Sequence, residues 1–185
     1  MTGEIIEDAK REMDKTLEAF RHELTRVRTG RASTALIENL HVDYYGAKTP
    51  LRSLAGLAAP EPRLLVITPY DKAAMHDIEK AIQTSDLGLT PMNDGKLIRI
   101  PIPELTEERR KDLVKKIRKD AEEFRVGIRN HRRDANDLLK EMNKEKQVTD
   151  DELRTAEAKV QQLTTEFIER LDKVLAAKEA EIMEV

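Results

Sequence analysis

Arginine side chains recur at helical spacing within residues 106–146, the longest periodic stretch of the chain. The set consists of Arg125, Arg129, Arg132, Arg133 and Asn136. Steps of three and four residues place most of them along one side of an α-helix, at the rim of a stripe of apolar residues. A rim arginine can rest its aliphatic stem on the core and keep its guanidinium in water, where the planar fork fits phosphate oxygens. The pattern therefore predicts a surface that binds phosphate.

A second explanation is a solvated helix face on which ion pairs form, and this is the commoner use of such residues. Two features favour phosphate. The set holds arginine rather than lysine, and Arg21 and Arg28 flank the apolar seam of an earlier helix in the same manner. Arg28 and Arg31 also flank Gly30 in a corner suited to phosphate contact. Because no aromatic residues accompany the arginines, structured RNA is a better candidate than a single strand.

Composition bounds the class of protein. The chain has 185 residues, of which 37% are charged and 3% aromatic, with no Trp, no Cys and a formal net charge of −3. Residues 107–146 carry 14 basic and 10 acidic side chains, whereas residues 147–185 carry 5 and 10. A basic face on an acidic protein can bind a polyanion locally. Without Cys, a signal-peptide core or a run of about 18 apolar residues, we expect a cytoplasmic protein that binds no membrane.

Apolar residues at steps of three and four predict three long helices, over residues 4–28, 106–146 and 150–185. Gly30 is the expected stop of the first helix, and Thr149 with Glu152 forms a capping box before the third. The expected seam of the third helix is Leu153, Ala156, Val160, Leu163, Phe167, Leu171 and Val174. Because the connection at residues 147–149 is short, we expect an antiparallel three-helix bundle.

Residues 31–104 change to the alternation and apolar runs of strands. We expect strands at residues 40–45, 49–54, 57–59, 63–68 and 96–100, a hairpin turn at residues 93–95, and a helix over residues 72–84 that Asp71 caps. The predicted fold class is α+β: residues 1–30 and 105–185 form the bundle, and residues 31–104 form a small α/β domain, like a β/α/β sandwich, inserted between helices 1 and 2. A joint with Gly30 on one crossing and prolines on the other can act as a hinge.

Motifs for catalysis are absent from the sequence. There is no phosphate-binding glycine loop, no dinucleotide fingerprint, no H-E-x-x-H and no serine elbow. The histidines are scattered, and His22 and His131, which could approach each other across the bundle, lack a third ligand. We expect no catalytic residue, no metal and no cofactor.

Six blocks of residues resemble the bacterial ribosome recycling factor family, in its order and over the whole chain. They are Arg28-Thr29-Gly30-Arg31-Ala32-Ser33, Tyr44-Tyr45-Gly46, Ser85-Asp86-Leu87-Gly88-Leu89, Arg99-Ile100-Pro101-Ile102-Pro103, Leu105-Thr106-Glu107-Glu108-Arg109-Arg110-Lys111 and Arg129-Asn130-His131-Arg132-Arg133-Asp134-Ala135-Asn136. The resemblance implies an L-shaped molecule of two domains, roughly like transfer RNA in outline.

The resemblance also implies a function. Such a factor binds the large ribosomal subunit of the post-termination complex through its rRNA, and elongation factor G, a GTPase, then drives release from mRNA and separation of the subunits. The factor itself is not an enzyme. RNA contact in the family matches Arg28, Arg129 and Arg132 here, and the family's hinge matches Gly30 with Arg31 and the segment around Leu105 and Thr106.

Two departures from the family pattern bear on packing. His131 stands where an aliphatic residue is usual, and residues 59–62 are rich in proline.

Two other functions compete with that of a translation factor. A helical adaptor that dimerises through its seams has no use for an inserted α/β module, and an enzyme of that module lacks an acid, base or nucleophile. An adaptor would be an oligomer, whereas we expect a monomer.

Overall fold

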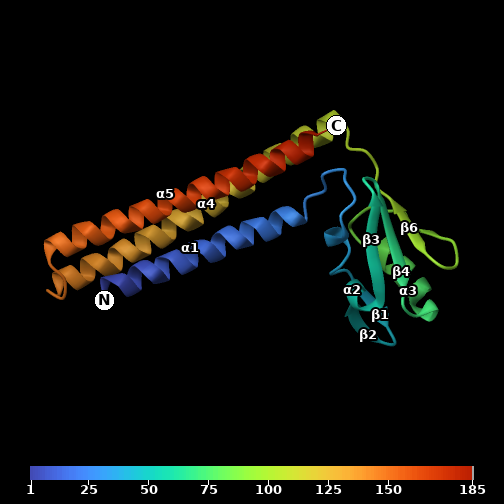
Figure 1. Cartoon of the computed structure of the whole chain (residues 1–185), viewed down its shortest axis with the longest axis horizontal. Helices are drawn as coiled ribbons and strands as arrows, with labels where there is room; N and C mark the ends of the chain where they lie inside the picture. The colour runs from blue at the N-terminus through green and yellow to red at the C-terminus, as the bar shows by residue number, and fades with distance from the viewer. Residues whose placement is uncertain (185) are drawn as a thin grey trace. The chain divides into compact units, whose positions relative to one another are not determined.

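The computed structural model describes residues 1–184 and contains a helical bundle and a smaller unit with β-sheet (Figure 1). The chain divides into two compact units: Met1–Leu24 together with Glu108–Val185, and Thr25–Glu107. The smaller unit is thus inserted in the sequence between the first and second long helices.

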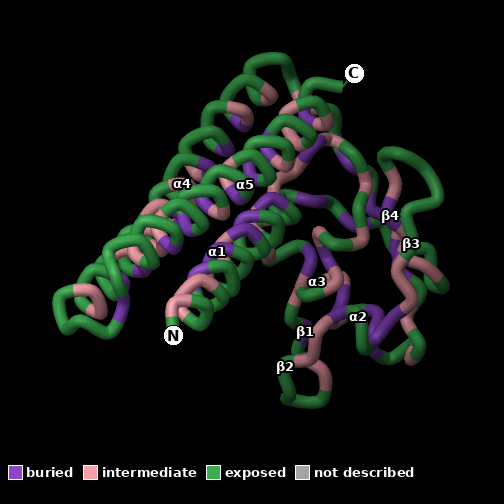
Figure 2. Tube along the Cα trace, turned by 60° about the vertical axis from the view of Figure 1, so that its left-hand side comes forward, coloured by how far each residue is buried: buried purple, intermediate pink, exposed green. Residues whose placement is uncertain are grey.

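Three long helices make up the first unit: α1 (Thr2–Thr25), α4 (Glu107–Lys144) and α5 (Asp150–Met183). The rings of Phe20 and Phe124 lie 5.2 Å apart, and Thr16 bonds His131 at 2.9 Å, so residue numbers fall along α4 as they rise along α1. Arg118 and Arg125 reach Glu179 and Asp172 in the same opposed order. The helices therefore form the predicted antiparallel bundle, and Figure 2 shows the buried residues running along their inner sides.

The first helix ends earlier than predicted, at Thr25 rather than residue 28. Gly30 is not its stop, because this glycine lies five residues further on with φ of +78°. The intervening residues are held by the smaller unit instead: Arg28 donates to the carbonyl oxygen of Leu87 at 2.6 Å, and Thr29 is buried. Tertiary contacts of this kind override the helical periodicity that continues to Val27.

The buried seam of α5 contains the predicted Ala156, Val160, Phe167 and Leu171 but departs from the prediction at other positions. Its buried residues are Ala156, Val160, Thr164, Phe167, Leu171, Leu175 and Ile182. Thr164 replaces Leu163, and Leu175 replaces Val174. A threonine can be buried here because its hydroxyl donates to the carbonyl oxygen of Val160 at 2.8 Å and so keeps a partner.

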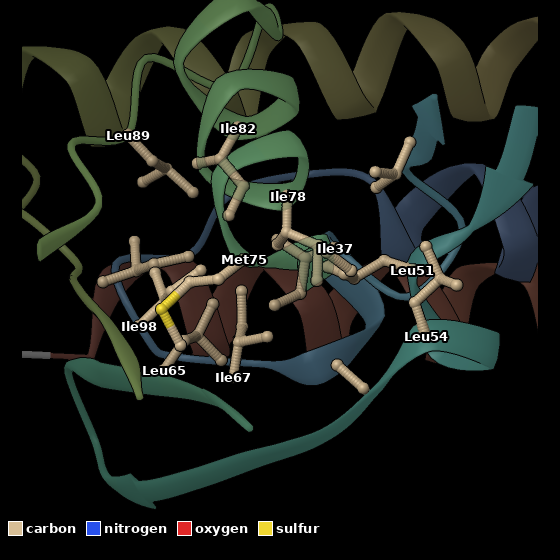
Figure 3. Close-up of a cluster of buried hydrophobic side chains, with 14 of the residues drawn as sticks. Ile37, Leu51, Leu54, Leu65, Ile67, Met75, Ile78, Ile82, Leu89 and Ile98 are labelled. Carbon is tan, nitrogen blue, oxygen red and sulfur yellow. The ribbon is translucent and has the colours of Figure 1, made fainter. Parts of the chain in front are cut away.

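The smaller unit holds two antiparallel sheets. In the first, β1 (His41–Tyr44) pairs with β2 (Ala47–Pro50). The second has the order β3 (Ala55–Glu61), β4 (Leu64–Pro69), β6 (Ile98–Pro101) and β5 (Met92–Asn93). The helix α3 (Met75–Thr84) follows a 3₁₀ turn that Asp71 caps, as predicted. Figure 3 shows Ile78 and Ile82 of α3 in one buried cluster with Leu65, Ile67 and Ile98 of the sheet.

The strand predicted at residues 49–54 is wrong in its second half. The short helix α2 (Leu51–Leu54) replaces it, directly after β2 ends at Pro50. Leu51 and Leu54 are both buried, and one helical turn brings residues three apart onto one face, whereas a strand would not.

The third strand, β3, is longer than predicted and includes Pro60. Because β3 lies at the edge of its sheet, a residue without an N–H is tolerated there.

Among the described residues, no helix combines the length and the apolar character needed to cross a bilayer.

The capping box at the start of α5 generates a stability prediction. The hydroxyl of Thr149 accepts from the Glu152 amide at 3.2 Å, and the Glu152 carboxylate accepts from the Thr149 amide at 2.8 Å. Thr149→Ala should lower the free energy of unfolding by about 1 kcal/mol, measured by denaturant and helical circular dichroism. Thr155→Ala is the control: this hydroxyl bonds only the preceding turn, and alanine favours the helix. Equal stability of Thr149→Ala and the parent would contradict the capping role.

Candidate nucleic-acid interface

The predicted arginine rim, defined as Arg125, Arg129, Arg132, Arg133 and Asn136, lies on α4, and two of its members reach across to α5. The Nε and Nη2 atoms of Arg125 donate to Asp172 Oδ1 at 2.9 and 2.6 Å. The Nη1 atom of Arg132 donates to Gln161 Oε1 at 3.1 Å. Polar residues of α5 thus determine how these two guanidinium groups are held.

Arg125 is largely enclosed, and two carboxylates pair with its charge. Its side chain is 20% exposed, and besides Asp172 it bonds Glu122 at 3.1 Å. Burial acts to lower the pKa of Arg125, but the bonds to Asp172 and Glu122 together outweigh it and raise that pKa above its ordinary value. A phosphate could reach this guanidinium only in competition with two carboxylates.

Arg129 shares the same carboxylate. Its Nη1 donates to Glu122 Oε1 at 2.9 Å, and its side chain is 41% exposed. The bond from Arg129, and next the bond from Arg125, hold the pKa of Glu122 below its ordinary 4.5. Glu122 therefore stays ionised at neutral pH and offsets part of the positive charge of both arginines.

Arg132 differs because its partner is neutral. It is half-buried, and within residues 1–184 its polar partner is the amide of Gln161, with no carboxylate in ion-pair range. Its guanidinium is thus oriented by the fold while its charge remains uncompensated by a partner. Arg133 is exposed and, across the described part of the chain, makes no polar contact. The rim therefore divides into two neutralised arginines and two whose charge is free.

Asn136 lies on the rim as predicted, but its side-chain oxygen does not face solvent. Its Oδ1 atom is buried and finds no hydrogen-bond partner among the residues that the structure describes. An enclosed oxygen cannot be the atom that meets a ligand arriving from solvent. Of the Asn136 side chain, the Nδ2 donor is therefore the atom left to meet a ligand, beside the guanidinium groups of the rim.

The other predicted RNA-contacting residues, Arg28 and Arg31, lie in the smaller unit rather than with the rim. Arg28 bonds Leu87 within that unit, and Arg21 on α1 pairs with Glu18 one turn earlier at 3.2 Å. Arg21 and Arg28 thus each have a local partner.

The predicted hinge residues also cluster within the smaller unit. A Cβ built on Gly30 would lie 3.4 Å from Leu105 Cγ, so the two crossings of the chain touch at this point. The units divide at residues 24 and 25 and at residues 107 and 108, a few residues nearer the bundle than the predicted boundaries. Gly30 adopts φ of +78°, a conformation that side chains with a Cβ rarely adopt.

His131, the departure noted in the sequence, packs between α1 and α4. Its Nε2 bonds Thr16 Oγ1, and the side chain lines a pocket of about 160 Å³ with Glu12 and Asp134. Within the described chain, no three His, Cys, Asp or Glu residues are placed to hold a metal ion. The histidine is accommodated by one polar partner from the neighbouring helix.

The shared carboxylate generates a prediction by NMR. The Glu122 carboxyl should titrate below 4.5, and Arg129→Ala should raise that midpoint more than Arg125→Ala, because the Arg129 bond contributes most. A carboxylate with a depressed pKa stabilises the fold at neutral pH, and this contribution is lost only as the pH falls below about 4.5. Lys119→Ala, which removes a nearby charge but no bond, is the control. A Glu122 midpoint that Arg129→Ala leaves unchanged would disprove the pairing.

Known proteins were compared with this chain in sequence and structure. Residues 20–183 match the family model described as Ribosome recycling factor. Ribosome-recycling factors of Shouchella clausii and Bacillus subtilis are 55% and 54% identical over 185 residues, with 100% of both chains covered.

Two solved structures are similar to the whole chain. A solution structure of a ribosome recycling factor has a TM-score of 0.81 at 40% identity and covers 100% of this chain and 98% of its own. The T. thermophilus factor, in models with E. coli elongation factor G on the E. coli post-termination complex, has a TM-score of 0.68 at 48% identity and 100% coverage of both chains. The resemblance read from the six sequence blocks is confirmed, and the chain belongs to the ribosome recycling factor family.

Proposed function

We propose that this protein binds the large ribosomal subunit of the post-termination complex and, with elongation factor G and GTP, separates the ribosome from mRNA and splits its subunits. Its membership of the family and the T. thermophilus relative, which is described together with elongation factor G on that complex, support this role. The protein is a translation factor and not an enzyme, so the hydrolysis of GTP belongs to its partner. Its place of action is the cytoplasm, with the ribosomes.

The arrangement of Arg132 is the observation that carries the RNA-binding part of the proposal. A half-buried stem and one hydrogen bond to Gln161 hold the guanidinium in place, and no carboxylate neutralises it within the described residues. Phosphate and base edges are both ligands for such a fork. Arg133 beside it adds a second free charge, whereas Arg125 and Arg129 contribute less because they are already paired.

The two units divide the work in this proposal. The bundle carries the arginine rim and contacts rRNA, while residues 31–104 serve the protein partner. Residues 32–106 carry 7 basic and 9 acidic side chains, a poor composition for binding phosphate. The joint at Gly30, Arg31, Leu105 and Thr106 acts as the hinge, at which the two units reorient when elongation factor G acts on the protein.

The factor acts as a monomer in this proposal. Each helix of the bundle buries an apolar seam, and within residues 1–184 the large apolar side chains that remain exposed on the bundle, such as Val126 and Leu138, form no long stripe for a second copy. Sedimentation at increasing concentration distinguishes it from a dimeric adaptor.

Arg132→Ala tests the RNA-binding face. The variant loses a charge-assisted hydrogen bond worth roughly 1.5–3 kcal/mol, so its affinity for large ribosomal subunits should fall at least about tenfold at fixed salt. The salt dependence should flatten by about one phosphate contact. The thermal midpoint should stay within a few degrees, because an exposed polar contact adds about 0–1 kcal/mol.

Arg11→Ala is the matched control for this test. It removes the same charge from an exposed position on α1, where Arg11 pairs with Asp8 at 2.6 Å. Its affinity for the large subunit should stay close to that of the parent. If Arg132→Ala binds as tightly as Arg11→Ala, the rim is not the RNA-binding face.

Gly30→Ala tests the joint. A Cβ at φ of +78° is strained by about 1–2 kcal/mol, and here it would also lie in van der Waals contact with Leu105, 3.4 Å from its Cγ. Subunit splitting with elongation factor G and GTP should slow, whereas ribosome binding should change little. Gly95→Ala introduces the same type of strain at φ of +90° but in open space, and should split subunits like the parent. Normal splitting by Gly30→Ala would remove the hinge from the proposal.

A further inference from the structure

We infer that Gln161 of α5 is the positioning residue for Arg132: it orients the guanidinium with a neutral hydrogen bond and leaves the charge available to phosphate. The inference rests on the proposed contact between Arg132 and rRNA, and it assigns a role to a residue that does not itself touch the RNA.

Three arginines of α4 reach α5 at intervals of seven residues. Arg118 donates to Glu179 at 2.6 and 3.1 Å, Arg125 donates to Asp172, and Arg132 donates to Gln161. Seven residues are about two helical turns, so the three arginines occupy equivalent places on α4. Their partners on α5 are not equally spaced: Glu179 and Asp172 are seven residues apart, whereas Gln161 lies eleven residues before Asp172, one turn beyond Thr165, which would continue the series. The third arginine therefore bonds an amide from the next turn of α5, where the other two bond a carboxylate.

The amide of Gln161 has one workable orientation. A guanidinium has donors alone, so Gln161 must turn its oxygen toward Arg132. Its Nε2 then donates to Thr165 Oγ1 at 3.3 Å. The Thr165 hydroxyl in turn donates to the main-chain carbonyl oxygen of Gln161 at 3.1 Å. Both ends of the amide are thus used, and the acceptor for Arg132 is held in place by its own helix.

A neutral acceptor and a carboxylate have different consequences for a ligand. Both reduce the freedom of the arginine side chain before binding, which lessens the ordering cost when phosphate arrives. A carboxylate also cancels the charge and must be displaced or repelled by the incoming phosphate. Glutamate has the shape of glutamine, so the site would accept it; the amide at this one place keeps Arg132 both ordered and charged.

Gln161→Glu is the central test, measured as affinity for bacterial large ribosomal subunits across a salt series. The new carboxylate should pair with Arg132 as Asp172 pairs with Arg125, and affinity should fall about tenfold with a salt slope shallower by about one contact. The thermal midpoint should hold or rise, which separates this loss from unfolding. Gln161→Ala should weaken binding severalfold with the slope unchanged, because the charge remains.

Gln162→Glu is the matched control on the same helix. It makes the same change of net charge at an exposed neighbour that bonds Glu166 rather than the rim. Screening limits the reach of such a charge to roughly 8–10 Å at moderate salt, so affinity should change less than about threefold.

A double variant shows whether the effect passes through the arginine. When Arg132→Ala is already present, Gln161→Glu should cause no further loss of affinity.

The outcomes separate the inference from the proposed function. If Arg132→Ala weakens binding while Gln161→Glu binds like Gln162→Glu, Gln161 is not the positioning residue and the RNA-binding face stands. If Gln161→Glu weakens binding equally with and without Arg132, its effect does not pass through that arginine and the inference is wrong. If Arg132→Ala binds like the parent, the proposed face fails and the inference fails with it.

Discussion

A helix of 38 residues, the length of α4, is not stable in water unless long partners cover its apolar side, because helical stability in proteins comes mainly from packing. The chain provides these partners from its two ends. Leu113, Ile117, Ala121, Ile128, Ala135 and Leu139 are the buried residues of α4. Since α1 and α5 must both lie against this stripe, the rotation of α4 about its own axis is set, and with it the direction in which every polar residue of the helix points.

The same rotation places a line of arginines at the edge of α5. Packing decides where Arg118, Arg125 and Arg132 stand, but the residues of α5 decide what each can do. A bidentate bond to Glu179 and a pair of bonds to Asp172 convert the first two into stabilising contacts between helices. The third meets an amide. In the proposed function, the charge of the α5 partner therefore distinguishes Arg118 and Arg125, which stabilise the contact between helices, from Arg132, which stays available to phosphate.

This separation explains how far the sequence predicts the site. Periodicity within residues 106–146 is a local property, so the helix, its seam and its arginine rim could be predicted, as could the cap at Thr149. The Asp172 carboxylate on Arg125 and the amide on Arg132 lie 47 and 29 positions away, and only the packed register reveals them. Errors in the fold have the same origin. Thr25, Leu51 and Thr164 each deviate from a local pattern because a tertiary contact or a hydrogen bond is stronger than the local preference.

The carboxylates that neutralise part of the rim also bear on selectivity. Binding of an arbitrary polyanion grows with the number of free cationic groups, because each one releases counterions. Glu122, Asp172 and Glu179 withdraw Arg129, Arg125 and Arg118 from that number, and the net charge of the protein is −3. In the proposed function, attraction to RNA in general is therefore weak, while the ordered guanidinium of Arg132 contributes fully where its surroundings fit. With carboxylates on Arg118, Arg125 and Arg129 and an amide on Arg132, such a bundle would bind by shape and position more than by total charge.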